Sequence, residues 1–199
     1  MAFAYPVMLE LRGRRAVVIG ALAASEGKDL ALREAGAEVT FLANGAWRPE
    51  DLEGAFLVVA SSDDPAERDA IARAARERGV LVNVMDDVPN CDFAAPAIVH
   101  RGDLVIAVGT GGRSPAVAAK IRADLEDRYG AEWAEVLTIV GEVRAESVRS
   151  MPDLRERARR WRSALDVEEA TSLVRAGRGD ELRRRLRTRM QIATEPSVA

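Results

Sequence analysis

The sequence predicts an α/β protein built on an open, mostly parallel β-sheet and followed by helices. Three observations support this fold class. Short apolar runs alternate with helical patterns between residues 16 and 84. Each run is bounded by turn residues and has the length of a fully buried strand. Beyond residue 116 the pattern is only helical.

The parallel strands are expected at the apolar runs, which are residues 16–19, 38–42, 56–60 and 80–84. A helical pattern over 30–35 ends at Gly36, and another over 66–78 ends at Gly79, as helices commonly do. Residues 88–103 are expected to be irregular, and 104–108 to form one more buried strand of the sheet.

A glycine-rich loop, residues 109–114, follows the strand predicted at 104–108. It ends at Ser114, a predicted N-cap, and Pro115 takes the first helical position. Such a loop exposes backbone N–H groups at a helix N-terminus, where carboxylates and phosphates bind. A plain strand-to-helix connection is an equally good interpretation of the loop alone.

Ligands of an open α/β sheet bind beyond the carboxyl ends of its strands. Four features are expected to converge there on one cleft, namely Gly20, residues 61–63, residues 86–87 and residues 109–114. Asp86 is the best candidate for acid–base work, because it follows an apolar strand and has a second carboxylate beside it. The alternative is an aspartate that only caps local backbone N–H groups.

Five helices are expected after the glycine-rich loop, over residues 116–129, 131–150, 152–165, 167–176 and 180–192. One apolar stripe within them is formed by Val136, Ile139, Val140 and Val143. It predicts either a helical core or a dimer seam. The tail from Thr194 is expected to fray.

Composition excludes several classes of protein. No apolar run is long enough to span a bilayer, and the N-terminus lacks the layout of a secretory signal. Cys91 is the single cysteine and His100 the single histidine, so an internal disulfide framework and a Cys/His metal site are excluded, and a cytoplasmic location is expected. The arginine-rich residues 151–199 predict a solvated helix face or an acidic ligand. A nucleic-acid partner is not expected, because the pI is about 5.4 and no recognition motif accompanies the arginines.

Nine short motifs, taken together and in order, resemble the precorrin-2 dehydrogenase / sirohydrochlorin ferrochelatase family of siroheme synthesis, in its stand-alone form. They are Tyr5-Pro6, the turn at Gly20, Glu34 to Thr40, Asp51 to Ala60, Asn83 to Asp87, Cys91 to Phe93, Pro96 to Ile98, Arg101 to Asp103 and Thr110 to Pro115. The resemblance covers residues 5–190.

The resemblance implies three regions: a Rossmann-like NAD-binding domain over 1–115, a dimerisation region over 116–150 and a small helical domain over 151–199. It implies a homodimer that oxidises precorrin-2 to sirohydrochlorin with NAD. In some members ferrous iron is then inserted as a substrate to give siroheme. The implied partner is therefore a polycarboxylate tetrapyrrole.

The resemblance also assigns candidate residues. The family's key aspartate falls on Asp86, and its regulatory hydroxyl falls on Thr110. Candidates for binding the tetrapyrrole are Thr110, Gly111, Gly112 and Ser114. Candidates for binding NAD are Gly20, Ala23, Ala24, Asn44, Gly45 and Ser62. No resident metal is expected.

The chain departs from the family on the nucleotide side. Of the family's first loop, Gly-Gly-Gly-x-Val-Ala-x-Arg-Lys, only Gly20 and Lys28 remain, and Leu22 stands where the backbone should approach a pyrophosphate. No acidic residue ends the second strand, and residues 41–50 are too few for the family's extra strand. Two alternatives follow: a member that only inserts metal, and a non-catalytic tetrapyrrole carrier.

Overall fold

The structure is a computed structural model that describes residue 3 and residues 5–192; the side chains of residues 22–25 and the tail expected to fray fall outside this description. The chain divides into two compact units. One comprises Met1–Pro96 with Gly109–Pro115, and the other comprises Ala97–Val108 with Ala116–Ala199.

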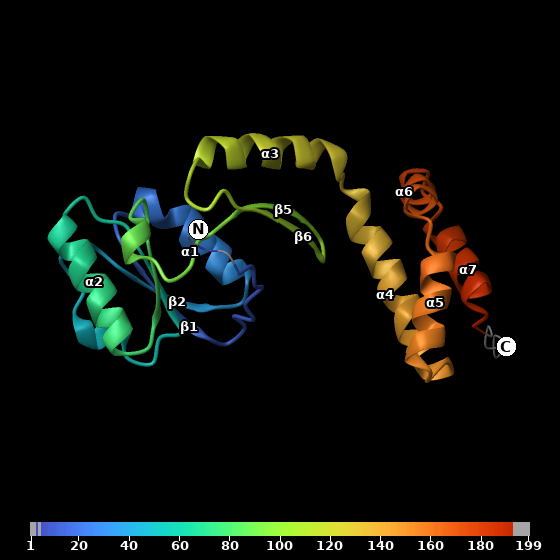
Figure 1. Ribbon diagram of the computed structural model, residues 1–199, viewed down its shortest axis with the longest axis horizontal. Helices are drawn as coiled ribbons and strands as arrows, with labels where there is room; N and C mark the ends of the chain where they lie inside the picture. Colours follow the sequence, from blue (N-terminus) through green and yellow to red (C-terminus); the bar gives the residue numbers. More distant parts are fainter. Residues whose placement is uncertain (1–2, 4, 193–199) are drawn as a thin grey trace. The chain divides into compact units, whose positions relative to one another are not determined.

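The first unit contains the predicted parallel sheet (Figure 1). Its strands are β1 (Arg15–Ile19), β2 (Glu38–Leu42), β3 (Leu57–Ala60) and β4 (Leu81–Val84), in the order β2-β1-β3-β4. All four predicted strands are confirmed to within one residue. The register aligns the strand ends, since Ile19 lies opposite both Leu42 and Ala60, and Ala60 lies opposite Val84.

Helices α1 (Leu22–Glu34) and α2 (Pro65–Glu77) cover opposite faces of this sheet (Figure 1). Val17 and Ile19 pack toward α2, whereas Ala16 packs in the cluster that includes Leu32 of α1. The 3₁₀ helix η1 (Pro49–Leu52) lies before β3, and η2 (Val88–Asn90) follows β4. Helix α1 starts earlier than predicted, because Gly27 inside it weakens the sequence pattern.

The prediction for residues 88–108 is wrong in two respects: part of the segment expected to be irregular forms a strand, and the strand expected to join the parallel sheet does not join it. Residues 104–108 form β6 (Leu104–Val108), which pairs antiparallel with β5 (Ala97–Arg101) in a separate two-stranded sheet. Arg101 pairs with Leu104, so the chain reverses through the two residues Gly102 and Asp103. A Gly-Asp pair between apolar runs is itself a hairpin signal, and this local turn decided the pairing.

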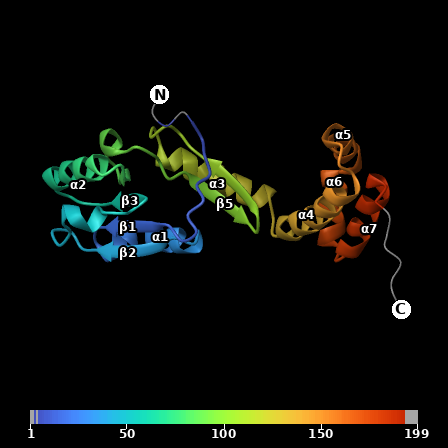
Figure 2. The same cartoon turned by 90° about the horizontal axis from the view of Figure 1, so that it is seen from below.

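Over its described residues, the second unit contains this hairpin and the helices α3 (Pro115–Arg128), α4 (Glu132–Ser150), α5 (Leu154–Ala164), α6 (Val167–Arg175) and α7 (Gly179–Met190) (Figure 2). Val136, Ile139 and Val143 of α4 are buried in one core with residues of α6 and α7. The apolar stripe of α4 is therefore a helical core. Within the described part of the chain, no helix is both long and apolar enough to cross a membrane.

Candidate functional site at the carboxyl edge of the parallel sheet

The carboxyl ends of all four parallel strands lie at one edge of the first unit, and each is tied to its neighbour by the backbone. Gly20 N donates to Leu42 O at 3.0 Å, Ser61 N to Ile19 O at 2.8 Å, and Met85 N to Ala60 O at 2.8 Å. The loops that follow the strands therefore start side by side. This confirms the expected convergence of Gly20, residues 61–63 and residues 86–87.

Asp86 occupies an unusual backbone conformation directly after β4. Its φ is 60°, in the left-handed region, and its side chain is exposed. Aspartate and asparagine tolerate this region better than most residues, and such conformations often occur at functional positions. The turn therefore presents the Asp86 carboxylate outward from the sheet edge.

Asp87 has a different role from its neighbour. Its Oδ2 accepts hydrogen bonds from Arg68 Nε at 3.0 Å and from Asn90 Nδ2 at 3.1 Å. The bond from Asn90 is the largest influence on the pKa of Asp87; burial opposes it, Arg68 supports it, and the pKa is lowered. Asp87 is thus bonded within the turn, whereas Asp86 is exposed to solvent.

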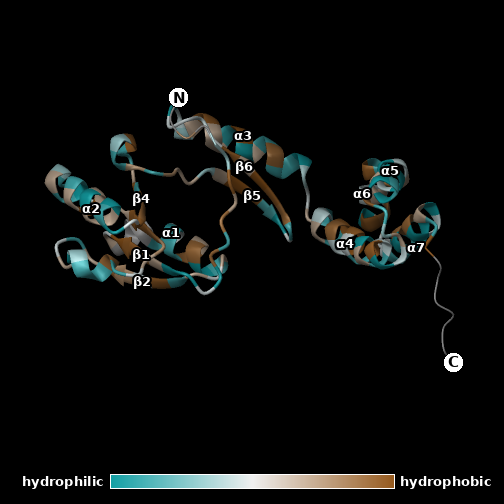
Figure 3. Ribbon diagram, turned by 60° about the horizontal axis from the view of Figure 1, so that its bottom comes forward, coloured by the Kyte–Doolittle hydropathy of each residue, from teal (hydrophilic) through white to brown (hydrophobic). Residues whose placement is uncertain are grey.

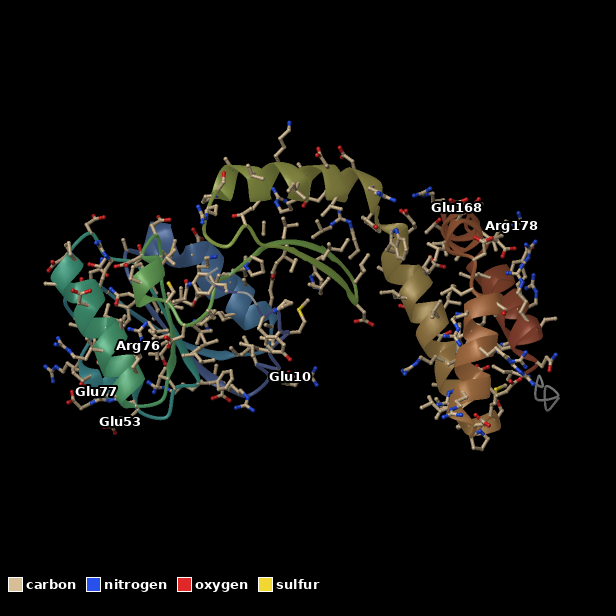
Figure 4. The ribbon with its side chains drawn as sticks, viewed as in Figure 1. Glu10, Glu53, Arg76, Glu77, Glu168 and Arg178 are labelled. Atoms are coloured by element: carbon tan, nitrogen blue, oxygen red, sulfur yellow. The ribbon has the colours of Figure 1, made fainter. Side chains whose placement is uncertain are left out.

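The far end of the same turn is also fixed. Arg76 of α2, labelled in Figure 4, donates to Asp92 Oδ1 at 3.1 Å, and Val82 N donates to Asp92 Oδ2 at 3.2 Å. The Cys91 thiol donates to Val84 O at 3.1 Å, and burial raises its pKa. These bonds tie the segment that follows Asp86 back to α2 and β4, which is the kind of support that positions a site.

The glycine-rich loop reaches the Asp86 turn, although it follows a hairpin and not a parallel strand. Gly112 has a φ of 76°, and a Cβ on it would lie 3.1 Å from Cγ2 of Val88. Thr110 Oγ1 accepts from Ser114 N at 3.2 Å and donates to Ser114 O at 3.2 Å, which closes the loop. The loop and the turn are therefore neighbours, as expected, but they are joined through a different topology.

The start of α1 suits an anion. Its N-cap, Ala21, has no side-chain capping bond, and the first turn carries no acidic residue. Backbone N–H groups at such a helix end bind pyrophosphate. The side chains of Ala23 and Ala24, two of the candidate NAD residues, lie outside the described part of the structure.

Glu67 is a site residue that the sequence analysis missed. It belongs to the first turn of α2 and hydrogen-bonds to groups in the loops after β2 and β3, namely Gly45 N, Trp47 Nε1 and Ser62 Oγ. It lies three residues after the N-cap Asp64, where a glutamate usually serves its own helix end. Here it places a carboxylate close to the end of β2, where dinucleotide-binding folds keep one for a ribose hydroxyl.

Other candidates lie outside this site. Most of the C-terminal arginines are paired with glutamates of the helical unit, as Arg185 and Arg189 are with Glu169, and Arg187 with Glu146. Arg178, labelled in Figure 4, pairs with Glu181. This favours structural ion pairs over an acidic ligand there. His100 is exposed on β5. Among the residues that the structure describes, no group of three or more histidine, cysteine or carboxylate side chains could hold a metal ion.

Comparison with known proteins agrees with this geometry. Residues 7–97 match a family described as putative NAD(P)-binding, and residues 101–128 match the central region of sirohaem biosynthesis proteins. Siroheme synthase 1 of Pectobacterium atrosepticum is 34% identical over 191 residues, which cover 86% of this chain and 40% of that protein. Siroheme synthase of Methylococcus capsulatus is 30% identical, covering 90% of this chain and 42% of that protein.

The chain thus spans about two fifths of the length of these relatives. Among solved structures, SirC, precorrin-2 dehydrogenase, superposes with a TM-score of 0.73 at 22% identity, covering 92% of this chain and 99% of that one. That match establishes the fold. The two family matches and these relatives show that the chain is similar to sirohaem biosynthesis proteins, with a putative NAD(P)-binding region at residues 7–97.

Proposed function

We propose that this chain oxidises precorrin-2 to sirohydrochlorin with NAD as hydride acceptor, a step of siroheme biosynthesis. The observation that carries the proposal is the Asp86 turn with the glycine-rich loop packed beside it, at the carboxyl edge of a parallel sheet. The names of the siroheme synthase relatives and of SirC support the same reaction.

The nucleotide side of the edge has a donor set that fits NAD, which when bound accepts the hydride. The backbone N–H groups that begin α1, just after Gly20, would hold the pyrophosphate. The loop at Asn44 and Gly45, with Ser62 from the next strand end, would surround the adenosine ribose. The Glu67 carboxylate supplies the acceptor that β2 itself lacks.

The tetrapyrrole side has a carboxylate and backbone donors. Asp86 takes the proton that leaves the substrate as the hydride departs. The N–H groups of Gly111 and Gly112, with Ser114, bind the substrate's carboxylates, because successive backbone N–H groups form anion sites. Thr110 holds this loop closed through Ser114, so modification of its hydroxyl would open the substrate side of the site.

An NAD titration and one substitution test this proposal. We expect calorimetry to give a heat of NAD binding, and Asp86→Asn to lower kcat by about 10²-fold or more. Asparagine tolerates the left-handed turn, so the variant keeps the fold. Glu38→Gln, an exposed carboxylate at the start of β2 and so at the opposite edge of the sheet, is the control and keeps its activity. If NAD gives neither a heat of binding nor a thermal shift, the dehydrogenase assignment is wrong. If Asp86→Asn keeps full activity, the role assigned to Asp86 is wrong.

Iron insertion is the second candidate, and the loss of first-loop glycines favours it, since that step needs no NAD. Ferrous iron would enter sirohydrochlorin as a substrate, and Asp86 would accept the two protons that leave the pyrrole nitrogens one after the other, passing each to solvent. An insertion assay without nucleotide, followed by absorbance, distinguishes the two activities. Tetrapyrrole binding with neither activity would identify a carrier.

We also propose that the chain acts as a homodimer in the cytoplasm. The ribbon of the β5–β6 hairpin is coloured largely as hydrophobic (Figure 3). By the strand register Ile98 and Val105 lie on one face of it, and they are 46% and 38% exposed. Exposed apolar side chains that lie together on a sheet face can mark an interaction site, and this face is the one we assign to the dimer. The single cysteine suits a reducing compartment.

A further inference from the structure

The Glu67 side chain connects two loops that are distant in the sequence, the loop after β2 and the loop after β3. Its Oε1 accepts from Gly45 N at 2.7 Å and from Trp47 Nε1 at 2.9 Å, both in the loop after β2. Its Oε2 accepts from Ser62 Oγ at 2.5 Å, in the loop after β3. A carboxylate accepts about four hydrogen bonds, so one acceptor position remains for a ligand hydroxyl.

Two backbone N–H groups at the N-terminus of helix α2 have hydrogen-bond acceptors other than Glu67. Asp64 accepts from Ala66 N at 2.9 Å, and Ser62 Oγ accepts from Asp64 N at 3.1 Å. A glutamate at the third helical position commonly accepts a hydrogen bond from the N-cap N–H. In α2 the N–H of the N-cap Asp64 donates to Ser62 Oγ instead. Glu67 is thus committed to the loops and not to its own helix.

The Glu67 carboxylate is negatively charged where it lies. Burial raises its pKa, but the hydrogen bonds from Ser62, Gly45 and Trp47 together outweigh burial, and the pKa lies below its usual value. The basic residue nearest to this loop in sequence is Arg48, which is exposed to solvent. Arg68 of α2 donates to Ser62 O at 2.9 Å, but its Nε is paired with Asp87 at 3.0 Å. The charge in direct contact with Gly45 and Trp47 is therefore that of Glu67.

We propose that Glu67 is the positioning and specificity-determining residue of the nucleotide site: it joins the loops after β2 and β3 and excludes dinucleotides that carry a 2′-phosphate. This inference rests on the proposed function, because it requires a dinucleotide at this edge. In such folds a carboxylate at the end of the second strand bonds to the ribose 2′-hydroxyl, and a phosphate there meets like charge. In this chain the carboxylate comes from a helix instead of the strand.

Paired titrations of NAD and NADP by calorimetry test the inference on the intact protein. We expect the unchanged chain to bind NAD at least about 100-fold more tightly than NADP. In Glu67→Gln that ratio should fall below about 10, because the charge is gone while a similar shape remains. In Glu67→Asp the charge is kept and the reach is shortened, so both affinities fall and the ratio persists.

The matched control is Glu77→Gln on the same helix, whose side chain is 65% exposed and labelled in Figure 4. It should leave both affinities unchanged. The dependence on salt is a second measurement, and it needs no variant. Raising the ionic strength from about 0.05 M to about 0.5 M should lower the ratio of NAD affinity to NADP affinity in the unchanged chain, because salt screens the repulsion between Glu67 and the 2′-phosphate.

The outcomes separate the two proposals. If the unchanged chain binds neither dinucleotide, the dehydrogenase proposal fails. If it binds NAD but Glu67→Gln lowers both affinities by the same factor, Glu67 is merely structural and the specificity inference is overturned. If NADP binds as tightly as NAD to the unchanged chain, the inference is overturned as well, and Arg48 becomes the residue to test.

Discussion

At the scale of single residues, two adjacent aspartates of similar chemistry have opposite roles. Asp86 is exposed in a left-handed turn, whereas Asp87 is only 18% exposed and bonds to Arg68 and Asn90. The difference arises because one side chain points away from the unit and the other points toward α2. Asp87 already accepts two side-chain hydrogen bonds, so of the two carboxylates Asp86 is the one that we propose for the substrate.

The lowered pKa of Asp87 predicts a pH-dependent contribution to stability. A carboxyl whose folded pKa is depressed stabilises the fold above its ordinary value of 3.8, and that contribution is lost as pH falls through the folded pKa. Asp87→Asn should therefore lower the free energy of unfolding by about 1 kcal/mol at neutral pH, near the upper end for partly exposed pairs. Urea titrations from pH 7 to pH 3 should show this difference shrinking below about pH 4. A difference that stays constant over this range would show that charge is not its cause.

At the scale of elements, the tip of the β5–β6 hairpin is fitted closely to α4. Gly102 has a φ of 58°, and a Cβ on it would lie 2.9 Å from the Cβ of Ala134 and 3.0 Å from its Cα. The hairpin can approach the helix only because this residue has no side chain. The sequence suggests the glycine as a turn residue, and the structure shows its second role as a contact point.

Two glycine substitutions in this unit should change stability in opposite directions. Gly102→Ala should destabilise it by about 2–4 kcal/mol, from left-handed strain and overpacking against α4. Gly141→Ala should stabilise it by about 0.5–1 kcal/mol, because Gly141 is helical, exposed and has open space around its Cα. Urea unfolding followed by tryptophan fluorescence measures both. Equal effects of the two substitutions would contradict the contact with α4.

At the scale of the whole molecule, the chain forms two units with different means of stabilisation. The first has an apolar sheet between helices, and its charged groups organise loops. The second has a helical core surrounded by arginine–glutamate pairs. The arginines that suggested an acidic ligand in the sequence are mostly partners of nearby glutamates.

The proposed homodimer predicts the effect of charge on the hairpin. Ile98→Asp and Val105→Asp each place a carboxylate on the exposed face of the β5–β6 sheet, and an unpaired charge is costly in an interface. Light scattering should give a dimer for the unchanged chain and a monomer for each variant. Leu154→Asp, at the exposed start of α5, is the control and should keep the dimer mass. A monomeric unchanged chain would refute the dimer.

The sequence alone was enough to predict the parallel sheet and the place of Asp86 directly after one of its strands; the left-handed turn at Asp86 came from the structure. Strands such as Arg15–Ile19 are short apolar runs between turn residues, and their carboxyl ends meet at one edge whatever their order. Periodicity is a local property, so it can be recognised without knowledge of distant contacts. The same holds for Ser114 and the glycines before it, which mark a loop by their types alone.

Only the tertiary structure decided the partners of each residue. The strand at Leu104–Val108 had the right composition for the sheet, but the turn at Gly102 and Asp103 paired it with β5. Glu67 had the spacing of a capping residue, but its carboxylate bonds to Gly45 and Trp47 across the sheet edge. The local sequence determines which backbone conformations are low in free energy. Which distant donor a carboxylate meets depends on packing that no local pattern encodes.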